Sequence, residues 1–287
     1  MGKGVRGMGN ILFQIADEQL LMSLHTHIYL DIEYIHQKVY VDYTKKSVTN
    51  RLYKLEQAGY IRYEYLPVTS SRNQKRKVAK PQRIYTLTPK GVEMVCGFRG
   101  EVHWKNSWSK RSASFVYHSL MLAKIECAMT LISKQEERLE LKEWINEPRA
   151  TFQYAKGKSR VIRPDGIAVI GLKEEIDKNI GVFMEMERSY GSKEVLEKKI
   201  IRYNDFMAQE GKAAEYRMHI GMGYEILQWR LVFIAGSESR EKELIRYLKG
   251  VSSPEIPVFI TLFQDILQDP FGNIYRNVQN SDKKVRL

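Results

Sequence analysis

The sequence has little cysteine, little proline and no long apolar run. Its 287 residues include 2 Cys and 8 Pro. Cys96 and Cys127 are too few for a disulfide framework or a Cys-based zinc site, so we expect both to be free thiols in the core. The low proline content, together with 43% hydrophobic residues, excludes an intrinsically disordered chain.

No apolar stretch approaches the roughly 20 residues of a membrane-spanning helix. The most apolar stretch, residues 229–236, has the length of a strand and is interrupted by Arg230. The N-terminal residues MGKGVRGMGN are basic but are not followed by the apolar segment and cleavage site of a secretory signal. We therefore expect a soluble, cytoplasmic protein that does not bind a membrane.

Acidic residues are scarce in the first third of the chain. Residues 1–110 contain 18 Lys and Arg against 9 Asp and Glu, a net charge of +9 (18 − 9). The remaining residues contain 28 against 25, a net charge of +3 (28 − 25), which completes the total of +12. A basic excess in one segment is typical of a nucleic-acid-binding module. The alternative is a basic surface that is merely solvated.

Three helices followed by two strands are predicted in this basic segment. Asp31 and Thr44 are suitable N-caps, and Gly59 stands where the third helix needs a C-cap. Apolar residues recur at helical spacing before Gly59 and alternate as in strands after it. The predicted elements are helices at 12–27, 31–40 and between Thr44 and Gly59, and strands at 61–66 and 83–87.

The polar face of the third helix carries cations, hydroxyls and an amide, with no acid before Glu56. Such a face suits the major groove of double-stranded DNA, and the basic segment between the two strands suits phosphates or the minor groove. The predicted DNA-binding residues are Lys45, Lys46, Ser47, Thr49, Asn50, Arg51 and Lys54 on the helix, and Arg72, Lys75, Arg76, Lys77 and Lys80 between the strands.

The string of elements resembles a winged helix-turn-helix DNA-binding domain over about residues 10–98. The segment IYTLTPKG resembles the second wing strand and the following helix start of the MarR/PadR-like branch. A protein-binding winged helix is the alternative, and the basic wing argues against it.

After residue 111 helices alternate with strands. A long helix in ASFVYHSLMLAKIECAMTLISKQ precedes three strand-like segments, of which VFMEMER is the third. A helix, a strand, a second helix and a last strand, VFITLFQDI, follow. This order predicts an α/β (α+β) fold with a mixed sheet. We expect a DNA-binding domain at 1–100, a linker at 101–111 and a second domain at 112–287.

Two carboxylates lie on neighbouring predicted strands of the second domain. Asp165 begins one strand and Glu185 lies toward the end of the next, so in paired strands they would converge. Two carboxylates and water suit Mg²⁺ or Mn²⁺, which can activate water for phosphodiester cleavage. By alternation, Glu187 shares the face of Glu185. The alternative is a salt bridge that neutralises Glu185 with Arg163, Arg188 or Lys199.

The segments Pro164-Asp165 and Glu185-Met186-Glu187 resemble the motifs of the PD-(D/E)xK nuclease superfamily. Glu187 stands where that motif has its Lys, and the resemblance implies that Lys199 on the following helix replaces it, with Lys198 as the alternative.

The segments YHSLMLAKIE, RPDGIAVI, FMEMER, KKIIRY and DPFGNIYR together resemble the replication-relaxation family over nearly the whole chain. Members are encoded on plasmids and integrative elements and are thought to act in replication or mobilisation. The resemblance implies a restriction-endonuclease-like second domain. It also implies site roles for Glu185, Glu187, Arg188, Lys199, Tyr203 and His118.

Two functions remain open. In the first, a sequence-specific DNA-binding protein nicks DNA, with Asp165 and Glu185 as metal ligands; its catalytic residues are Asp165, Glu185, Glu187, Lys199 and His118. In the second, a winged-helix transcriptional regulator keeps a degenerate nuclease-like domain for dimerisation, as the missing Lys at 187 favours. Such regulators commonly act as homodimers. A third alternative, an adaptor without a nucleic-acid role, conflicts with the +9 segment.

Overall fold

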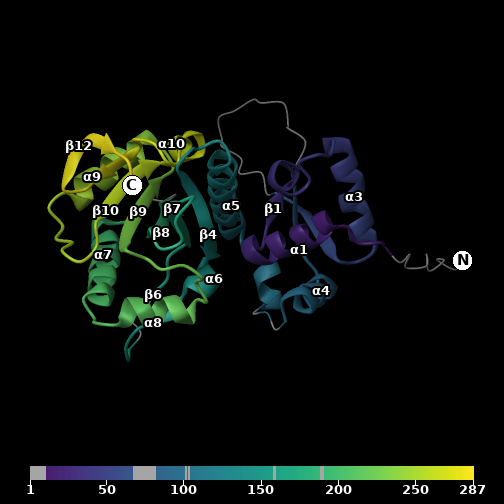
Figure 1. The fold of residues 1–287 in the computed structure, drawn as a ribbon, viewed down its shortest axis with the longest axis horizontal. Coiled ribbons are helices and arrows are strands. Elements are labelled where there is room, and N and C mark those ends of the chain that lie inside the picture. Colours follow the sequence, from purple (N-terminus) through teal and green to yellow (C-terminus); the bar gives the residue numbers. More distant parts are fainter. Residues whose placement is uncertain (1–10, 67–81, 101, 103, 158–159, 188–190) are drawn as a thin grey trace, which may run out of the picture. The chain divides into compact units, whose positions relative to one another are not determined.

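The chain folds into two compact units, Met1–Ala123 and Lys124–Leu287, whose helices and strands are labelled in Figure 1. The division falls inside helix α5 (Ala113–Ser133), whereas the sequence analysis placed the linker at 101–111; the domain limits at 100 and 112 stay a prediction. The computed structural model describes residues 11–66, 82–100, 102, 104–157, 160–187 and 191–287.

The N-terminal unit combines a helical group with a three-stranded sheet of order β1-β3-β2. Strands β2 and β3 pair antiparallel, as in a wing hairpin. The predicted order of three helices followed by two paired strands is therefore present, and their assignment to a winged helix-turn-helix stays a prediction. Its elements are α1 (Ile15–His27), β1 (Leu30–Asp31), α2 (Ile32–Tyr34) continued by the π-helix η1 (Ile35–Val39), α3 (Lys45–Gln57), β2 (Ile61–Tyr65), β3 (Arg83–Leu87), α4 (Pro89–Arg99) and the 3-10 helix η2 (Asn106–Ser109).

The predicted caps define these helices. The amide of Ser47 donates to the Thr44 hydroxyl at 3.2 Å and so begins α3. The amide of Tyr34 donates to the Asp31 carboxylate at 2.9 Å and begins α2. Gly59 has a φ of +80°, a conformation that glycine adopts without steric cost, and it turns the chain from α3 into β2.

The first half of α5 packs within the N-terminal unit. Val116 and Leu120 lie in one buried cluster with Tyr29 and Trp108. The Ser119 hydroxyl donates to the carbonyl of His27 on α1. These contacts explain why the compact N-terminal unit extends beyond the expected linker.

Helix α5 is long and apolar enough to cross a membrane by length and composition, with a mean hydropathy of 1.3 over the tested window. No such stretch was predicted from the sequence, because Lys124 and Glu126 interrupt the apolar residues of this helix. Half of that window is buried inside the protein, as in the core helix of a folded domain.

The second unit contains a seven-stranded mixed sheet of order β12-β11-β10-β9-β8-β7-β4. Strands β8, β9 and β10 run parallel, and the other pairings are antiparallel. The strands and short helix are β4 (Leu139–Asn146), α6 (Glu147–Ala150), β7 (Gly166–Leu172), β8 (Asn179–Glu187), β9 (Gln228–Ala235), β10 (Val258–Leu262), β11 (Tyr275–Asn277) and β12 (Asn280–Val285); β5 (Phe152–Gln153) and β6 (Val161–Ile162) form a separate pair.

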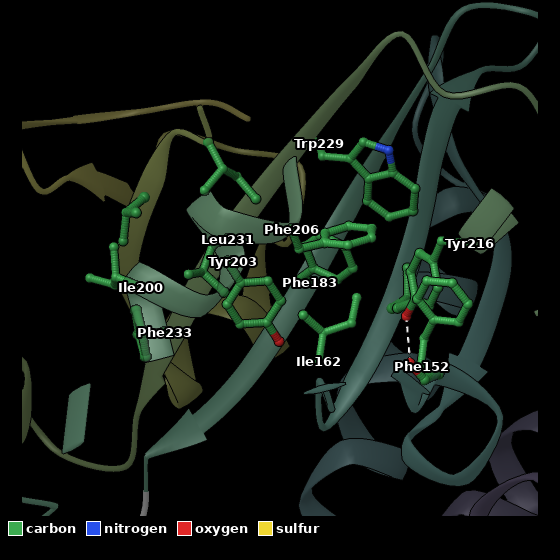
Figure 2. Packing of buried hydrophobic residues seen from close by; sticks show 14 of the residues in the cluster. Phe152, Ile162, Phe183, Ile200, Tyr203, Phe206, Tyr216, Trp229, Leu231 and Phe233 are labelled. Carbon is green, nitrogen blue, oxygen red and sulfur yellow. Dashed lines mark hydrogen bonds between the residues drawn. The ribbon is translucent and has the colours of Figure 1, made fainter. Parts of the chain in front are cut away.

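Three helices supply the apolar side chains that cover one face of this sheet: α7 (Lys193–Met207), α8 (Lys212–His219) and α9 (Glu238–Leu248). Figure 2 shows the centre of the cluster, where Phe183 of β8 stacks on Trp229 of β9 with ring centroids 4.6 Å apart. Gly181 makes room for this stack, because a Cβ at that position would lie 2.5 Å from the Trp229 ring.

The last predicted strand is wrong in its second half. Strand β10 ends at Leu262, and α10 (Phe263–Gln268) follows. Phe263 and Ile266 are both buried, which is the three-residue spacing of a helix and not the alternation of a strand. Helix α8 and strand β12 were not predicted from the sequence.

Candidate functional site

Strand β8 places two buried carboxylates against helix α7. Glu185 and Glu187 are 3% and 6% exposed. Both lie on the face of β8 that carries Phe183, because side chains alternate along a strand. On α7, Lys199 and Tyr203 lie one helical turn apart and therefore on the same side of the helix.

The two elements meet in a network of charge-assisted hydrogen bonds. The Lys199 Nζ donates to Glu185 Oε2 and to Glu187 Oε1, each at 2.8 Å. The Tyr203 hydroxyl donates to Glu185 Oε1 at 2.6 Å. Both oxygens of Glu185 are thus hydrogen-bonded, which offsets much of the cost of burying this carboxylate.

Asp165 lies beside Glu185 at the start of β7. Its amide donates to the carbonyl of Met184 at 3.0 Å, and its Oδ2 accepts the amide of Met186 at 2.7 Å. These two bonds bracket Glu185 in the neighbouring strand. The predicted convergence of Asp165 and Glu185 is therefore a feature of the fold.

Glu187 has a second cationic partner. Arg240, which is 4% exposed, donates from Nη2 to Glu187 Oε2 at 3.2 Å and from Nη1 to Glu243 at 2.6 Å. Arg240 was not among the predicted site residues. A signal was present, since Arg240 follows the N-cap Ser237 in the first turn of α9, where the helix dipole disfavours a cation unless it has an acidic partner.

The network shifts the pKa values of its members. Burial raises the pKa of Glu185 to about 7; the nearby charge of Asp165 adds to the rise, and Lys199 opposes it. Burial alone would lower the pKa of Lys199, but Glu185, Glu187 and Asp165 outweigh it, so this pKa lies above its usual value. Burial and the charge of Glu185 raise the pKa of Tyr203 well above that of a free tyrosine.

The carboxylates available to a hard divalent cation in this network are few. Among the described residues, no group of three or more His, Cys, Asp and Glu could hold a metal ion. Magnesium, however, needs only one or two carboxylates when water and phosphate oxygens complete its shell. Asp165 and Glu185 supply those two carboxylates, and each oxygen of Glu185 keeps a lone pair beyond its present hydrogen bond.

Two of the other predicted site residues are exposed. Lys198 is exposed on α7. Arg163 is exposed just before β7. His118 is half-buried on α5 in the N-terminal unit, and its catalytic role stays a prediction. Arg188 lies outside the described residues.

Most of the predicted DNA-binding face of α3 is open to solvent. Val48, Leu52 and Leu55 are buried on the opposite face. The exposed residues of this face are Lys45, Lys46, Ser47, Asn50 and Lys54, and Thr49 is half-buried. Lys45 pairs with Glu33 of α2. The wing residues Arg72, Lys75, Arg76, Lys77 and Lys80 lie outside the described part of the chain.

Arg51 differs from its neighbours on α3 because its guanidinium is turned toward α1. Its Nε donates to Asp17 Oδ1 at 2.8 Å, and its Nη2 donates to the Leu12 carbonyl at 2.7 Å. Asp17 is fully buried and also accepts the Tyr40 hydroxyl at 2.6 Å. In the structure Arg51 fixes α3 on α1, and its contact with DNA stays a prediction.

The sequence of residues 21–221 matches the replication-relaxation family. The chain belongs to this family. The match begins within α1 and covers α3, α5, Asp165, Glu185 and Lys199. No curated protein matches the sequence.

Two solved structures of the restriction endonuclease FokI are similar to this chain. For the structure titled as FokI alone, the identity is 13%, the TM-score is 0.31, and the match covers 88% of this chain and 42% of that one. For FokI bound to DNA the values are 12%, 0.28, 88% and 43%. The replication-relaxation chain thus spans less than half of the length of either FokI chain.

Proposed function

We propose that this protein binds double-stranded DNA sequence-specifically and acts in replication initiation or mobilisation of a plasmid or integrative element. The observation that carries the proposal is the exposed face of α3, where Lys46, Ser47, Asn50 and Lys54 present cations, a hydroxyl and an amide to solvent. These groups recognise phosphates and base edges in the major groove. Membership in the replication-relaxation family supports the biological setting.

The proposal is tested by fluorescence anisotropy of a labelled DNA duplex over a range of salt concentrations. The Lys46→Ala/Lys54→Ala double variant should bind more weakly, and the slope of log affinity against log salt should fall by about 2, because each phosphate contact contributes about 0.9. A Lys242→Ala/Lys249→Ala variant has the same change in net charge, but its exposed lysines lie in the second unit. Equal losses in both double variants would show that overall charge, and not α3, attracts the DNA.

For the second unit, we propose nicking of DNA with Mg²⁺ or Mn²⁺ held by Asp165 and Glu185. The ion would supply Lewis acidity and an activated water. Lys199 would orient groups at the reacting phosphate, since its ammonium already bridges Glu185 and Glu187 at 2.8 Å each. Its raised pKa keeps that ammonium charged at neutral pH, as stabilisation of an anionic transition state requires.

Calorimetric titration of Mn²⁺ into wild type and Asp165→Asn tests this part. Asparagine keeps an oxygen that can accept the Met186 amide, so the variant removes charge with little change in hydrogen bonding. We expect Mn²⁺ binding and nicking of supercoiled plasmid to be lost together. Because Glu185 has a pKa of about 7 and protons compete with the cation, Mn²⁺ affinity should rise between pH 6 and pH 8 in wild type.

A non-catalytic regulator is the second candidate function. The observation that favours it is the Lys199 network itself, which neutralises Glu185 and Glu187 through side chains of the protein. Absence of Mn²⁺ binding in wild type, with duplex binding retained, would assign the protein to this class. The nuclease-like unit would then serve for dimerisation, which sedimentation of the full chain with DNA would test.

A further inference from the structure

The wing hairpin carries an aromatic patch that the duplex-binding face of α3 does not use. Tyr63 pairs with Tyr85, and Tyr65 pairs with Arg83, in the antiparallel register of β2 and β3. Directly paired residues share one face of a sheet, so these four side chains form a continuous surface, named here the wing-base patch. Strand β2 follows α3 through the short turn at 58–60, and the two elements are in contact.

The side chains of the wing-base patch are ordered against one another. The Arg83 guanidinium lies 4.3 Å from the centroid of the Tyr63 ring. The rings of Tyr63 and Tyr65 meet edge to face at 5.5 Å. Tyr85 is 3% exposed and forms the floor, whereas Tyr65 is 51% exposed. One large aromatic ring is thus held in place and still open to solvent.

Charge on the two faces of the hairpin differs. The acid on β2, Glu64, is paired with Arg62 at 2.9 Å. Within the described residues, Arg83 forms no ion pair with a carboxylate and is exposed beside the tyrosines. An open aromatic ring next to an exposed guanidinium that stacks on a second ring matches a nucleobase and its phosphate, because bases stack on aromatic rings and on arginine.

We infer that the wing-base patch binds an unpaired base of locally melted DNA, with Tyr65 stacking on the base and Arg83 contacting the adjacent phosphate. The inference rests on the proposed DNA binding of this unit and extends it to a preference for duplexes that contain an unpaired region. Stacking is tolerant of sequence, since every base has a π face. The patch would therefore recognise the opened state of the DNA, while α3 reads the flanking duplex.

The test compares the affinity of the full protein for a duplex with its affinity for the same duplex carrying a central run of mismatches. Wild type should bind the mismatched DNA more tightly. Tyr65→Ala should lose about tenfold in affinity for the mismatched DNA and change duplex affinity less than twofold, since one stacked base accounts for this range. Tyr65→Phe keeps the ring and should behave as wild type.

Two further measurements separate stacking from loss of structure. A 2-aminopurine in the mismatched region should be quenched by wild type and Tyr65→Phe and not by Tyr65→Ala. Arg83→Gln keeps all three tyrosines and should weaken only mismatched-DNA binding, with a salt slope lower by about 1. Equal affinity of wild type for both DNAs, or equal losses on both DNAs in Tyr65→Ala and Arg83→Gln, would overturn the inference. If the Lys46→Ala/Lys54→Ala variant keeps full duplex affinity while the patch variants behave as expected, the proposed role of α3 is wrong and the inference about the patch is not.

Discussion

At the residue scale, the partners near a charged side chain decide whether it is held inside the protein or is open to solvent. Arg51 and Lys54 belong to the same helix, and the sequence predicts that both contact DNA. Arg51 is held by the buried Asp17, whereas Lys54 is exposed. Glu185 and Glu187 likewise owe their burial to Lys199 and Arg240. The partners of a charged side chain, and not its residue type, therefore show whether it stabilises the fold or is available to bind a ligand.

Replacement of Lys199 should destabilise the protein strongly. Lys199→Met leaves Glu185 and Glu187 facing each other with one cation fewer, and breaking such a buried pair costs on the order of 3 kcal/mol. The exposed neighbour Lys198→Met is the matched control and should change the free energy of unfolding by less than about 0.5 kcal/mol. Urea unfolding of both variants measures the difference, and equal stability would contradict a buried network.

Acidification should destabilise the N-terminal unit through His27. Burial, with the nearby charge of Lys38, lowers the pKa of His27 to about 3 from its ordinary value of 6.5. Below pH 6.5 the unfolded chain therefore binds a proton that the folded chain does not. The stability is complete above pH 6.5 and is lost as the pH falls toward 3, by up to about 1.4 kcal/mol per pH unit.

The His27→Phe variant isolates this effect, because phenylalanine keeps a ring beside Tyr34 and cannot titrate. The free energy of unfolding between pH 7 and pH 4, measured with urea, should fall less steeply in the variant than in wild type. Parallel pH profiles would show that other groups govern acid denaturation.

At the element scale, β8 and α7 act as one unit. Phe183, Glu185 and Glu187 lie on the face of β8 toward α7, and the two methionines lie on the other face. A single strand register therefore positions both the aromatic stack and the carboxylates. Lys199 and Tyr203 reach Glu185 because they are one helical turn apart. A shift of β8 by one residue would exchange the two faces and break every one of these contacts.

Gly181 is the sensitive point of this pairing. Gly181→Ala places a Cβ 2.5 Å from the Trp229 ring, and such overpacking costs about 1–3 kcal/mol. A Cβ at Gly223 would meet nothing within 4 Å, so Gly223→Ala is the control and should change the melting temperature little. An unchanged melting temperature for Gly181→Ala would mean that the Trp229–Phe183 stack can move without cost.

At the scale of the whole molecule, α5 belongs to both compact units. Its first half packs with the N-terminal unit through Val116 and Leu120. Its second half ends beside β4, where the Leu141 amide donates to the Ser133 hydroxyl at 2.8 Å. Deletions placed at the expected linker would therefore remove part of the N-terminal core.

A fragment of residues 1–133 should be more stable than a fragment of residues 1–111. The shorter fragment lacks Val116 and Leu120, which are 3% and 6% exposed, and burying two such side chains contributes about 3 kcal/mol or more. Urea unfolding followed by the fluorescence of Trp108 compares the two. Equal stability would place the boundary at 101–111, as the sequence analysis expected.

Much of the architecture followed from the sequence alone, because local signals specified it. The caps Thr44 and Asp31 and the turn at Gly59 depend on short-range hydrogen bonds and backbone sterics, which neighbouring residues dictate. The alternation in VFMEM placed Glu185 and Glu187 on one face, and the resemblance to the replication-relaxation family pointed to Lys199. The matched family confirms that resemblance.

Only the tertiary structure showed which charged side chains form ion pairs and where the strands and the two units end. The bonds of Arg51 to Asp17 and of Arg240 to Glu187 join residues 34 and 53 positions apart, a separation that leaves no periodic pattern in the chain. The second half of VFITLFQDI is helical because the burial of Phe263 and Ile266 overrides the strand pattern of its apolar residues. Folding brings distant segments into contact, and these contacts determine the partners of each site residue. Local sequence predicted some of the site residues but not their partners.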